Sequence, residues 1–336
     1  MIPQKVRNPS PLNPLPPGEG KIILEMMKQI KQEEKSVRKP DWIGRPLPSD
    51  PAFYRIRSLL DDGHLHTICQ EARCLNRGEC FSQRTAAFLI LGGSCTRLCR
   101  FCAVTQGTPE RPDPDEPRRV AEAAAWMSLS YIVVTSVTRD DLADGGAGFF
   151  AETIRFLRAR RSSARIEVLI PDFQGDEAAL RTVLEALPDV LNHNLETVAR
   201  LYPEVRPQAI YDRSLELLTR AGSRAPGIAV KSGLMLGLGE RPDEVESALR
   251  DLLGAGCQIL TLGQYLQPKR DCLPVARFVP PGEFDGWRET ALGMGFAQVA
   301  AGPLVRSSYH ARELYCNGSR TPVMTCRRGM RARERG

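Results

Sequence analysis

Three cysteines stand close together in the sequence at Cys95, Cys99 and Cys102, with the spacing C-x3-C-x2-C. They follow the apolar run 86–91 and a pair of glycines, so we expect them on a loop at the carboxyl end of a strand. Thiolates are soft ligands, and a compact set on one loop is typical of an iron–sulfur cluster. Three thiolates for four irons would leave one iron open to a substrate or cofactor. We call Cys95, Cys99 and Cys102 the downstream trio.

A second set of cysteines precedes it: Cys69, Cys74 and Cys80, spaced C-x4-C-x5-C and here called the upstream trio. Each trio is one ligand short of a closed four-ligand site. Structural zinc sites are the main alternative, and they usually take four ligands in paired arrangements. Neither trio has an adjacent fourth cysteine, although His64 and His66 precede the upstream trio closely. The pattern therefore favours two iron–sulfur clusters over zinc.

Length and composition bound the class of protein. The chain has 336 residues, 42% of them hydrophobic, which is enough for one large domain or two ordinary ones. No run approaches the roughly eighteen apolar residues of a membrane span, and the proline-rich residues 1–17 lack the apolar centre of a secretory signal. We therefore expect a cytoplasmic protein without a membrane partner. In a reducing compartment, ten cysteines, six of them clustered, indicate metal binding rather than disulfides.

Positive charge gathers at the two ends of the chain, which carries +6 in total. Residues 1–45 hold nine Lys and Arg against five acids, and residues 317–336 hold six Arg against one acid. Basic ends on a mildly acidic body are typical of solvated tails rather than of a nucleic-acid-binding surface. We predict a flexible basic arm over residues 1–38, with helical spacing at 21–35, and a disordered basic tail over 317–336. No nucleic-acid partner is expected.

From residue 86 onwards, apolar runs alternate with helical patterns. The runs predict strands at 86–91, 131–136, 165–170, 190–194, 228–236 and 258–263, with helices between them near 119–127, 148–160, 176–185, 214–221 and 243–253. This alternation indicates parallel βα units, and six of them fit a partial (β/α)6 barrel of the TIM type in the α/β class. The working loops of such a barrel gather at the carboxyl ends of its strands.

The barrel would occupy residues 86–285. Residues 39–85 would form an N-terminal extension that binds a cluster, with a short helix at 53–60 followed by an irregular loop that carries the upstream trio. Residues 286–316 would form a C-terminal extension that closes the barrel.

Several stretches resemble one known family. They read E-A-R-C-L-N-R-G-E-C at 71–80, S-V-T-R-D-D-L-A-D-G-G-A at 136–147, L-I-P-D-F at 169–173, H-N-L-E-T-V at 193–198, K-S-G-L-M-L-G-L-G-E at 231–240, G-Q-Y-L-Q-P at 263–268 and G-P-L-V-R-S-S-Y-H at 302–310. With the downstream trio, they make the chain similar to the radical S-adenosylmethionine superfamily and, within it, to lipoyl synthases. The resemblance runs from about Lys39 to Ala311.

The resemblance implies two 4Fe–4S clusters and S-adenosylmethionine as cofactors. The downstream trio would hold the cluster whose open iron chelates the methionine part of S-adenosylmethionine, and reductive cleavage would then give a 5′-deoxyadenosyl radical. The upstream trio would hold an auxiliary cluster that donates sulfur, with Ser308 as its fourth ligand and Ser307 as the alternative. A hydroxyl is a harder and weaker ligand for iron than a thiolate, which suits a cluster that must be opened.

The resemblance also suggests contacts to S-adenosylmethionine. Ser136 and the residues after it lie where superfamily members bind the amino group of the methionine moiety. Asn194 and Glu196 are candidates for the ribose or the methionine carboxylate, and Arg139 and Lys231 are candidates for that carboxylate.

The reaction implied is the insertion of two sulfur atoms at carbons 6 and 8 of a protein-bound octanoyl-lysine, consuming two molecules of S-adenosylmethionine. Unactivated C–H bonds require cofactor chemistry rather than acid–base residues. The implied partners are octanoylated carriers (lipoyl domains of 2-oxoacid dehydrogenase E2 subunits and the H protein of glycine cleavage), a ferredoxin- or flavodoxin-type electron donor and an iron–sulfur cluster carrier. The alternatives are a methylthiotransferase-like radical enzyme and a non-enzymatic iron–sulfur electron carrier.

A few positions depart from the family pattern. Leu75 stands where a proline is common and Phe81 where a tryptophan is common, and both read as packing substitutions. Cys272 stands where a histidine is usual and adds a thiol near the expected active face. Cys257 reads as a buried core thiol.

Overall fold

The computed structural model describes residues 38–44, 50–82 and 86–317. The chain divides at Lys39, and the described residues from Lys39 onwards form one compact unit. The basic arm and tail predicted for residues 1–38 and 317–336 lie outside the described residues, except for Arg38 and the backbone of Asn317. The helical pattern at 21–35 lies outside them as well.

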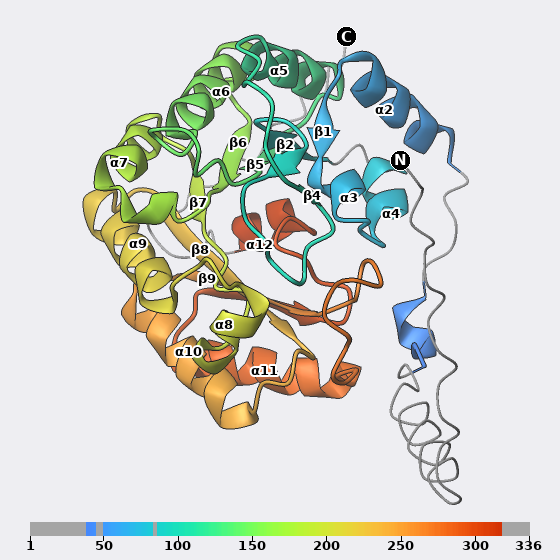
Figure 1. Ribbon diagram of the computed structural model, residues 1–336, viewed down its shortest axis with the longest axis vertical. Coiled ribbons are helices and arrows are strands. Elements are labelled where there is room, and N and C mark those ends of the chain that lie inside the picture. The colour runs from blue at the N-terminus through green and yellow to red at the C-terminus, as the bar shows by residue number, and fades with distance from the viewer. Residues whose placement is uncertain (1–37, 45–49, 83–85, 318–336) are drawn as a thin grey trace, which may run out of the picture. The chain divides into compact units, whose positions relative to one another are not determined.

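An eight-stranded sheet forms the centre of this unit (Figure 1). Seven of its strands pair in parallel, in the order in which they occur along the chain. They are β2 (Ala87–Ile90), β5 (Tyr131–Ser136), β6 (Arg165–Leu169), β7 (Val190–Asn192), β8 (Ala229–Leu236), β9 (Ile259–Gln264) and β10 (Gln298–Gly302). The short β1 (His66–Thr67) pairs antiparallel with β2 at one edge. Because β1 and β10 do not pair with each other, the barrel is partial.

Helices cover the outer side of the sheet, as Figure 1 shows. They are α5 (Glu116–Trp126), α6 (Ala147–Arg160), α7 (Glu177–Glu185), α9 (Tyr211–Arg224), α10 (Pro242–Gly254) and α11 (Pro281–Met294). Strands β2 and β9 are buried at every residue, because the helices shield one face and the barrel interior the other. These strands therefore read as continuous apolar runs, and the sequence predicted all six of those between residues 86 and 264.

The barrel is one parallel strand larger than predicted. Residues 298–302 were expected to belong to a closing extension, but they form β10 and pair with β9 over five residues. The sequence of β10 is Gln-Val-Ala-Ala-Gly, whose small residues have weak strand propensity. Tertiary pairing with β9 decides its conformation, and the extension begins only after Gly302.

The loop predicted for the upstream trio is largely helical, so that prediction was wrong. Cys69 lies on α3 (Ile68–Glu71) and Cys80 on α4 (Arg77–Ser82), while Cys74 lies in the turn between them. The Thr67 hydroxyl caps α3 by accepting a hydrogen bond from the Gln70 amide. The preceding helix α2 (Pro51–Asp62) contains the predicted helix at 53–60.

After β10 the chain turns into the barrel and crosses its interior. Val305 lies against Gly263 at the carboxyl end of β9, and the Ser307 carbonyl contacts Lys231 of β8. The chain then forms α12 (Ala311–Asn317), whose Tyr315 ring packs on Tyr131, the first residue of β5, with centroids 5.9 Å apart. The segment 303–310 therefore runs from the carboxyl ends of the strands towards their amino ends. We call it the C-terminal crossing segment.

Candidate active site

The downstream trio lies just beyond the carboxyl end of β2, as predicted, although its loop contains a short strand pair. Here β3 (Ser94–Cys95) pairs with β4 (Thr105–Gln106). The backbone amide of Thr138, which follows β5, donates a hydrogen bond to Cys95 Sγ at 3.3 Å. No disulfide joins cysteines within the described part of the chain. An amide aimed at a free sulfur favours negative charge there, as a cluster-binding loop requires.

Burial makes these thiols hard to ionise in the absence of metal. It raises the pKa of Cys102 to about 12, helped by Cys99 and Cys95, and it also raises the pKa of Cys99. The guanidinium of Arg206 opposes the shift at Cys99. Its Nη1 donates to the Asn194 and Leu195 carbonyls, whereas its buried Nε lacks a partner among the described residues. Soft sulfurs beside a buried cation fit an anionic iron–sulfur cluster.

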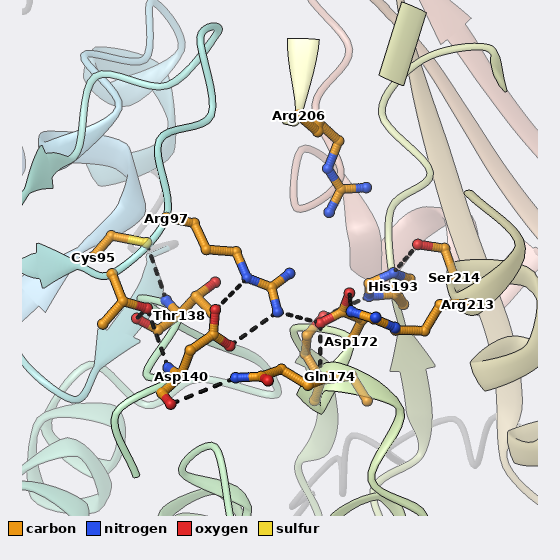
Figure 2. Close-up of polar contacts among 12 residues, drawn as sticks. Cys95, Arg97, Thr138, Asp140, Asp172, Gln174, His193, Arg206, Arg213 and Ser214 are labelled. Atoms are coloured by element: carbon orange, nitrogen blue, oxygen red, sulfur yellow. Dashed lines mark hydrogen bonds and ion pairs between the residues drawn. The ribbon is translucent and has the colours of Figure 1, made fainter. Parts of the chain in front are cut away.

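Arg97, between the first two cysteines of the trio, ties the loop to the next two strands. Its guanidinium donates to both carboxylate oxygens of Asp140 at 2.7 and 2.9 Å and to Asp172 at 2.5 Å. Figure 2 shows the guanidinium between these two carboxylates. Asp140 follows β5 and Asp172 follows β6, so the clamp crosses neighbouring carboxyl ends. We call Arg97, Asp140 and Asp172 the loop clamp.

No role was predicted for Arg97 from the sequence. A charged residue inside a cysteine motif, followed by acidic residues at the ends of two successive strands, was the signal that could have revealed it. Burial alone would raise the pKa of Asp172, but the hydrogen bond and charge of Arg97 outweigh it and hold that pKa at about 2. Asp172 is therefore ionised at neutral pH, and the clamp is a charged one.

Beside the clamp, His193 is held as a neutral ring. Its Nδ1 lies 2.8 Å from the Ile170 carbonyl and its Nε2 lies 3.0 Å from the Ser214 hydroxyl (Figure 2). A carbonyl can only accept, so Nδ1 carries the proton and Nε2 accepts from Ser214. Burial, together with the charge of Arg206, lowers the pKa of His193 to about 4.

Three of the residues predicted to contact S-adenosylmethionine lie at the carboxyl ends of β5 and β7. The Ser136 hydroxyl oxygen is buried and has no hydrogen-bond partner among the described residues. Such a group costs free energy unless something bonds to it, which fits a ligand at this position. Asn194 Nδ2 donates to Glu196 Oε1 at 3.1 Å, and burial raises the pKa of Glu196.

The other two predicted residues have protein partners. Arg139 donates to both carboxylate oxygens of Asp141, at 2.9 and 2.8 Å, and to the Leu91 carbonyl. Lys231 Nζ lies 2.8 Å from Glu167 Oε1 inside the barrel. A contact with a cofactor carboxylate would require each of them to exchange a partner.

Cys69, Cys80 and Ser308 line one cavity of about 310 Å³ near the amino ends of β2 and β5. Cys74 lies beside them, since its amide donates to the Cys69 carbonyl at 3.1 Å. Burial raises the pKa of Cys69 to about 11. Within the described residues, no three His, Cys, Asp or Glu side chains converge tightly enough for a single metal ion. A cluster of four irons spaces its ligands more widely than one ion does.

The two serines of the C-terminal crossing segment face different partners. The Ser307 hydroxyl lies 2.6 Å from Asn194 Nδ2 and is therefore engaged by the barrel. Ser308 lines the cavity of the upstream trio. The segment is also bound to the upstream helices, because Asn76 donates to the Leu304 carbonyl at 2.7 Å and the Tyr309 hydroxyl to Glu79 at 3.0 Å.

Electrostatic interactions link the two trios through the C-terminal crossing segment. Arg306 interacts electrostatically with Cys74 of the upstream trio and with Glu196, which in turn acts on Cys99 and Cys102 of the downstream trio. Burial lowers the pKa of Arg306. No role was predicted for Arg306 from the sequence, because the path of the crossing segment brings it within reach of Cys74 and Glu196.

Three other positions singled out in the sequence are buried. Cys257 packs in the core as predicted, and burial raises its pKa to about 12. Phe81 is fully buried against Phe53, which confirms its packing role. The Cys272 thiol donates to the Cys102 carbonyl at 3.4 Å, so it lies against the downstream loop.

Comparison with known proteins gives the same class as the site. The model of the radical SAM superfamily matches residues 89–252. A lipoyl synthase from Methylococcus capsulatus is 56% identical over 276 residues, which cover 82% of this chain and 86% of that protein. A lipoyl synthase from Desulfotalea psychrophila is 53% identical over 285 residues, which cover 85% of this chain and 95% of that protein. Among solved structures, HydG, a maturase of the FeFe hydrogenase, is similar in fold, with a TM-score of 0.50 at 15% identity over 77% of this chain and 67% of that one.

The partial parallel barrel, the downstream trio beyond its first parallel strand and the matched model define a radical S-adenosylmethionine enzyme. Identities above 50% across most of both chains go further: the chain belongs to the lipoyl synthase family. The methylthiotransferase and electron-carrier alternatives are thereby set aside. No helix within the described residues is long and apolar enough to cross a membrane.

Proposed function

We propose that this chain is a sulfurtransferase that inserts two sulfur atoms, at carbons 6 and 8, into an octanoyl chain carried on a lysine of a lipoyl domain. One observation carries the proposal beyond family membership: Arg306, on the segment that crosses the barrel interior, interacts electrostatically with Cys74 of the upstream trio and with Glu196, which acts on two cysteines of the downstream trio. An octanoyl chain in that interior would have a radical source on one side and a sulfur source on the other.

Each cofactor has residues that fit it. The downstream trio would hold a 4Fe–4S cluster, which together with S-adenosylmethionine supplies the 5′-deoxyadenosyl radical. The upstream trio with Ser308 would hold the auxiliary 4Fe–4S cluster that supplies sulfur. The contacts support Ser308 over Ser307, because Asn194 already binds the Ser307 hydroxyl while Ser308 faces the cavity of Cys69 and Cys80.

The chain's own residues position and shield rather than react. The loop clamp would fix the downstream loop relative to β5 and β6. Ser136, Asn194 and Glu196 would bind S-adenosylmethionine at the carboxyl ends of β5 and β7, with the unpartnered Ser136 hydroxyl gaining a hydrogen bond. The contacts of Arg139 and Lys231 favour structural roles for them. The crossing segment and α12 would exclude water from the interior, which protects a radical.

Each part of the chain would have its own role in the reaction. Residues 39–85 would bind the auxiliary cluster, the barrel would bind S-adenosylmethionine and the crossing segment would complete the auxiliary site. The carriers would be lipoyl domains of 2-oxoacid dehydrogenase E2 subunits or the H protein. A ferredoxin or flavodoxin would supply electrons, and a cluster carrier would rebuild the consumed cluster. We place the reaction in the cytoplasm, where thiolates stay reduced.

An anaerobic assay on reconstituted protein tests the function. It would contain S-adenosylmethionine, a reductant and an octanoyl-lysine peptide, with mass spectrometry of the peptide and of 5′-deoxyadenosine. The expected product is a peptide that has gained two sulfurs. A variant with Cys69, Cys74 and Cys80 replaced by alanine should still release 5′-deoxyadenosine but transfer no sulfur. Deoxyadenosine without sulfur insertion by the parent protein would refute the substrate assignment.

A further inference from the structure

A buried polar layer crosses the barrel interior below the candidate active site. Lys231 of β8 and Glu167 of β6 form an ion pair at 2.8 Å, with side chains 1% and 0% exposed. The Tyr131 hydroxyl donates to the second carboxylate oxygen at 2.6 Å, and Asn192 Nδ2 donates to the first at 3.0 Å. Side chains from β5, β7 and β8 thus meet at the Glu167 carboxylate of β6. This carboxylate holds the ammonium group of Lys231 in a fixed place.

Lys231 has one further partner, and it lies on the C-terminal crossing segment. Nζ donates to the Ser307 carbonyl at 2.6 Å. That carbonyl belongs to the peptide group that links Ser307 to Ser308, so its direction sets the orientation of Ser308. Asn194 holds the Ser307 hydroxyl as well. Ser307 is therefore fixed through both backbone and side chain, and Ser308 is left to face the cavity of Cys69 and Cys80.

We propose that Lys231 is a positioning residue for the auxiliary cluster, because it orients the Ser307–Ser308 peptide so that the Ser308 hydroxyl points at the iron site. The inference rests on the proposed function, which assigns Ser308 as a ligand. A hydroxyl is a weak ligand for iron, so its binding depends on being held in place beforehand. A hydrogen bond from a charged donor in a buried layer is strong enough to do this.

The ion pair with Glu167 explains how a buried lysine can donate to the Ser307 carbonyl. An isolated buried ammonium group would be costly, but the carboxylate compensates its charge and the layer is neutral. Lys231 can then donate to a neutral carbonyl without adding net charge beside the cluster. The layer also spans β5 to β8, so Ser308 is held by the barrel wall in addition to the contacts of Leu304 and Tyr309 with the upstream helices.

Two variants isolate the contact. In Glu167→Gln, the ion pair is lost but Lys231 can still donate to the Ser307 carbonyl. In the double variant Lys231→Met/Glu167→Gln, the ion pair is lost together with that donor. Both lose the ion pair, but Glu167→Gln also leaves the buried Lys231 amine without its carboxylate, which by itself destabilises that variant. Weaker protection in the double variant than in Glu167→Gln therefore runs against that cost and reports the contact with Ser307. Lys231→Arg keeps a charged donor and serves as the rescue variant.

The first readout is backbone amide exchange in the metal-free protein. The Tyr309 amide, which donates to the Arg306 carbonyl at 3.0 Å, reports the turn that contains Ser308. This amide should exchange at least about tenfold faster in the double variant than in Glu167→Gln. A hydrogen bond to a charged group usually contributes that much protection. Lys231→Arg should retain the protection of the parent. Equal protection in Glu167→Gln and the double variant would overturn the positioning role.

The second readout is electron paramagnetic resonance of the reduced auxiliary cluster, in protein whose downstream trio is replaced by alanine. The double variant should show the altered spectrum of Ser308→Ala, while Glu167→Gln should keep the parent spectrum. A parent-like spectrum from the double variant would overturn the proposal. If Ser308→Ala itself left the spectrum unchanged, the ligand assignment would fail, whereas amide exchange would still decide whether Lys231 holds the segment.

Discussion

Removal of the Arg97 guanidinium should destabilise the protein and empty its downstream cluster site. Arg97→Leu keeps apolar volume but leaves Asp172, whose side chain is fully buried, with weaker partners. These are Arg213 at 3.4 Å, which is partly exposed, and the Gln174 amide at 3.1 Å. Breaking a buried ion pair costs about 3–5 kcal/mol, and because Asp172 keeps two weaker partners we expect a loss of about 3 kcal/mol. That is a large share of the roughly 5–15 kcal/mol by which such domains are stable.

The assay is chemical denaturation of the metal-free protein, followed by iron analysis after reconstitution. Iron should be counted in protein whose upstream trio is replaced by alanine, so that only the downstream site contributes. Arg118→Leu is the matched control, since Arg118 is 43% exposed and pairs with Glu122 on the surface of α5, where solvent screens the ion pair and its loss should change stability little.

A double-mutant cycle tests the reasoning itself. Asp172→Asn removes the buried charge that Arg97→Leu leaves without its main partner. The double variant Arg97→Leu/Asp172→Asn should therefore lose less free energy of unfolding than the sum of the losses in the two single variants. Strictly additive losses would refute the clamp as an interacting unit. So would an Arg97→Leu variant that unfolds at the parent's denaturant concentration and binds the parent's iron.

Three further outcomes follow from the site. Ser308→Ala should abolish sulfur insertion and alter the auxiliary-cluster spectrum, while 5′-deoxyadenosine is still formed. Ser307→Ala should alter that spectrum much less. A larger spectral change in Ser307→Ala than in Ser308→Ala would make Ser307 the ligand. His193, with a pKa of about 4 against about 6.5 unfolded, stabilises the fold fully above pH 6.5 and loses about 3 kcal/mol as pH falls towards 4. Denaturation of His193→Asn should lack this loss, and an unchanged pH profile would contradict the assignment. A methyl group at Gly263 would clash with the Val305 carbonyl oxygen, so Gly263→Ala should lower the iron content of the upstream site only. Gly254→Ala is the control, because a methyl group there meets open space and should leave the iron content unchanged.

The sequence by itself determined the cofactor chemistry and most of the barrel. Cysteine is the residue that binds iron–sulfur clusters, and the spacing within each trio is local, so no tertiary information was needed to recognise Cys95, Cys99 and Cys102 as a set. The six mainly apolar runs could be recognised equally well, because strands buried on both faces are largely apolar. Their alternation with helices also predicted that the loops at the carboxyl ends of the strands gather at one end of the barrel.

Only the tertiary structure decided which residues meet across the barrel. The strand β10 forms because β9 pairs with it, since most of its own residues have weak strand propensity. Asp140 and Asp172 acquire a role only when Arg97, about forty and seventy-five residues away, lies between them. The choice between Ser307 and Ser308 depends on Asn194, which follows β7, and on Lys231 of β8. Contacts between distant segments depend on the path of the backbone, and a local pattern does not record that path.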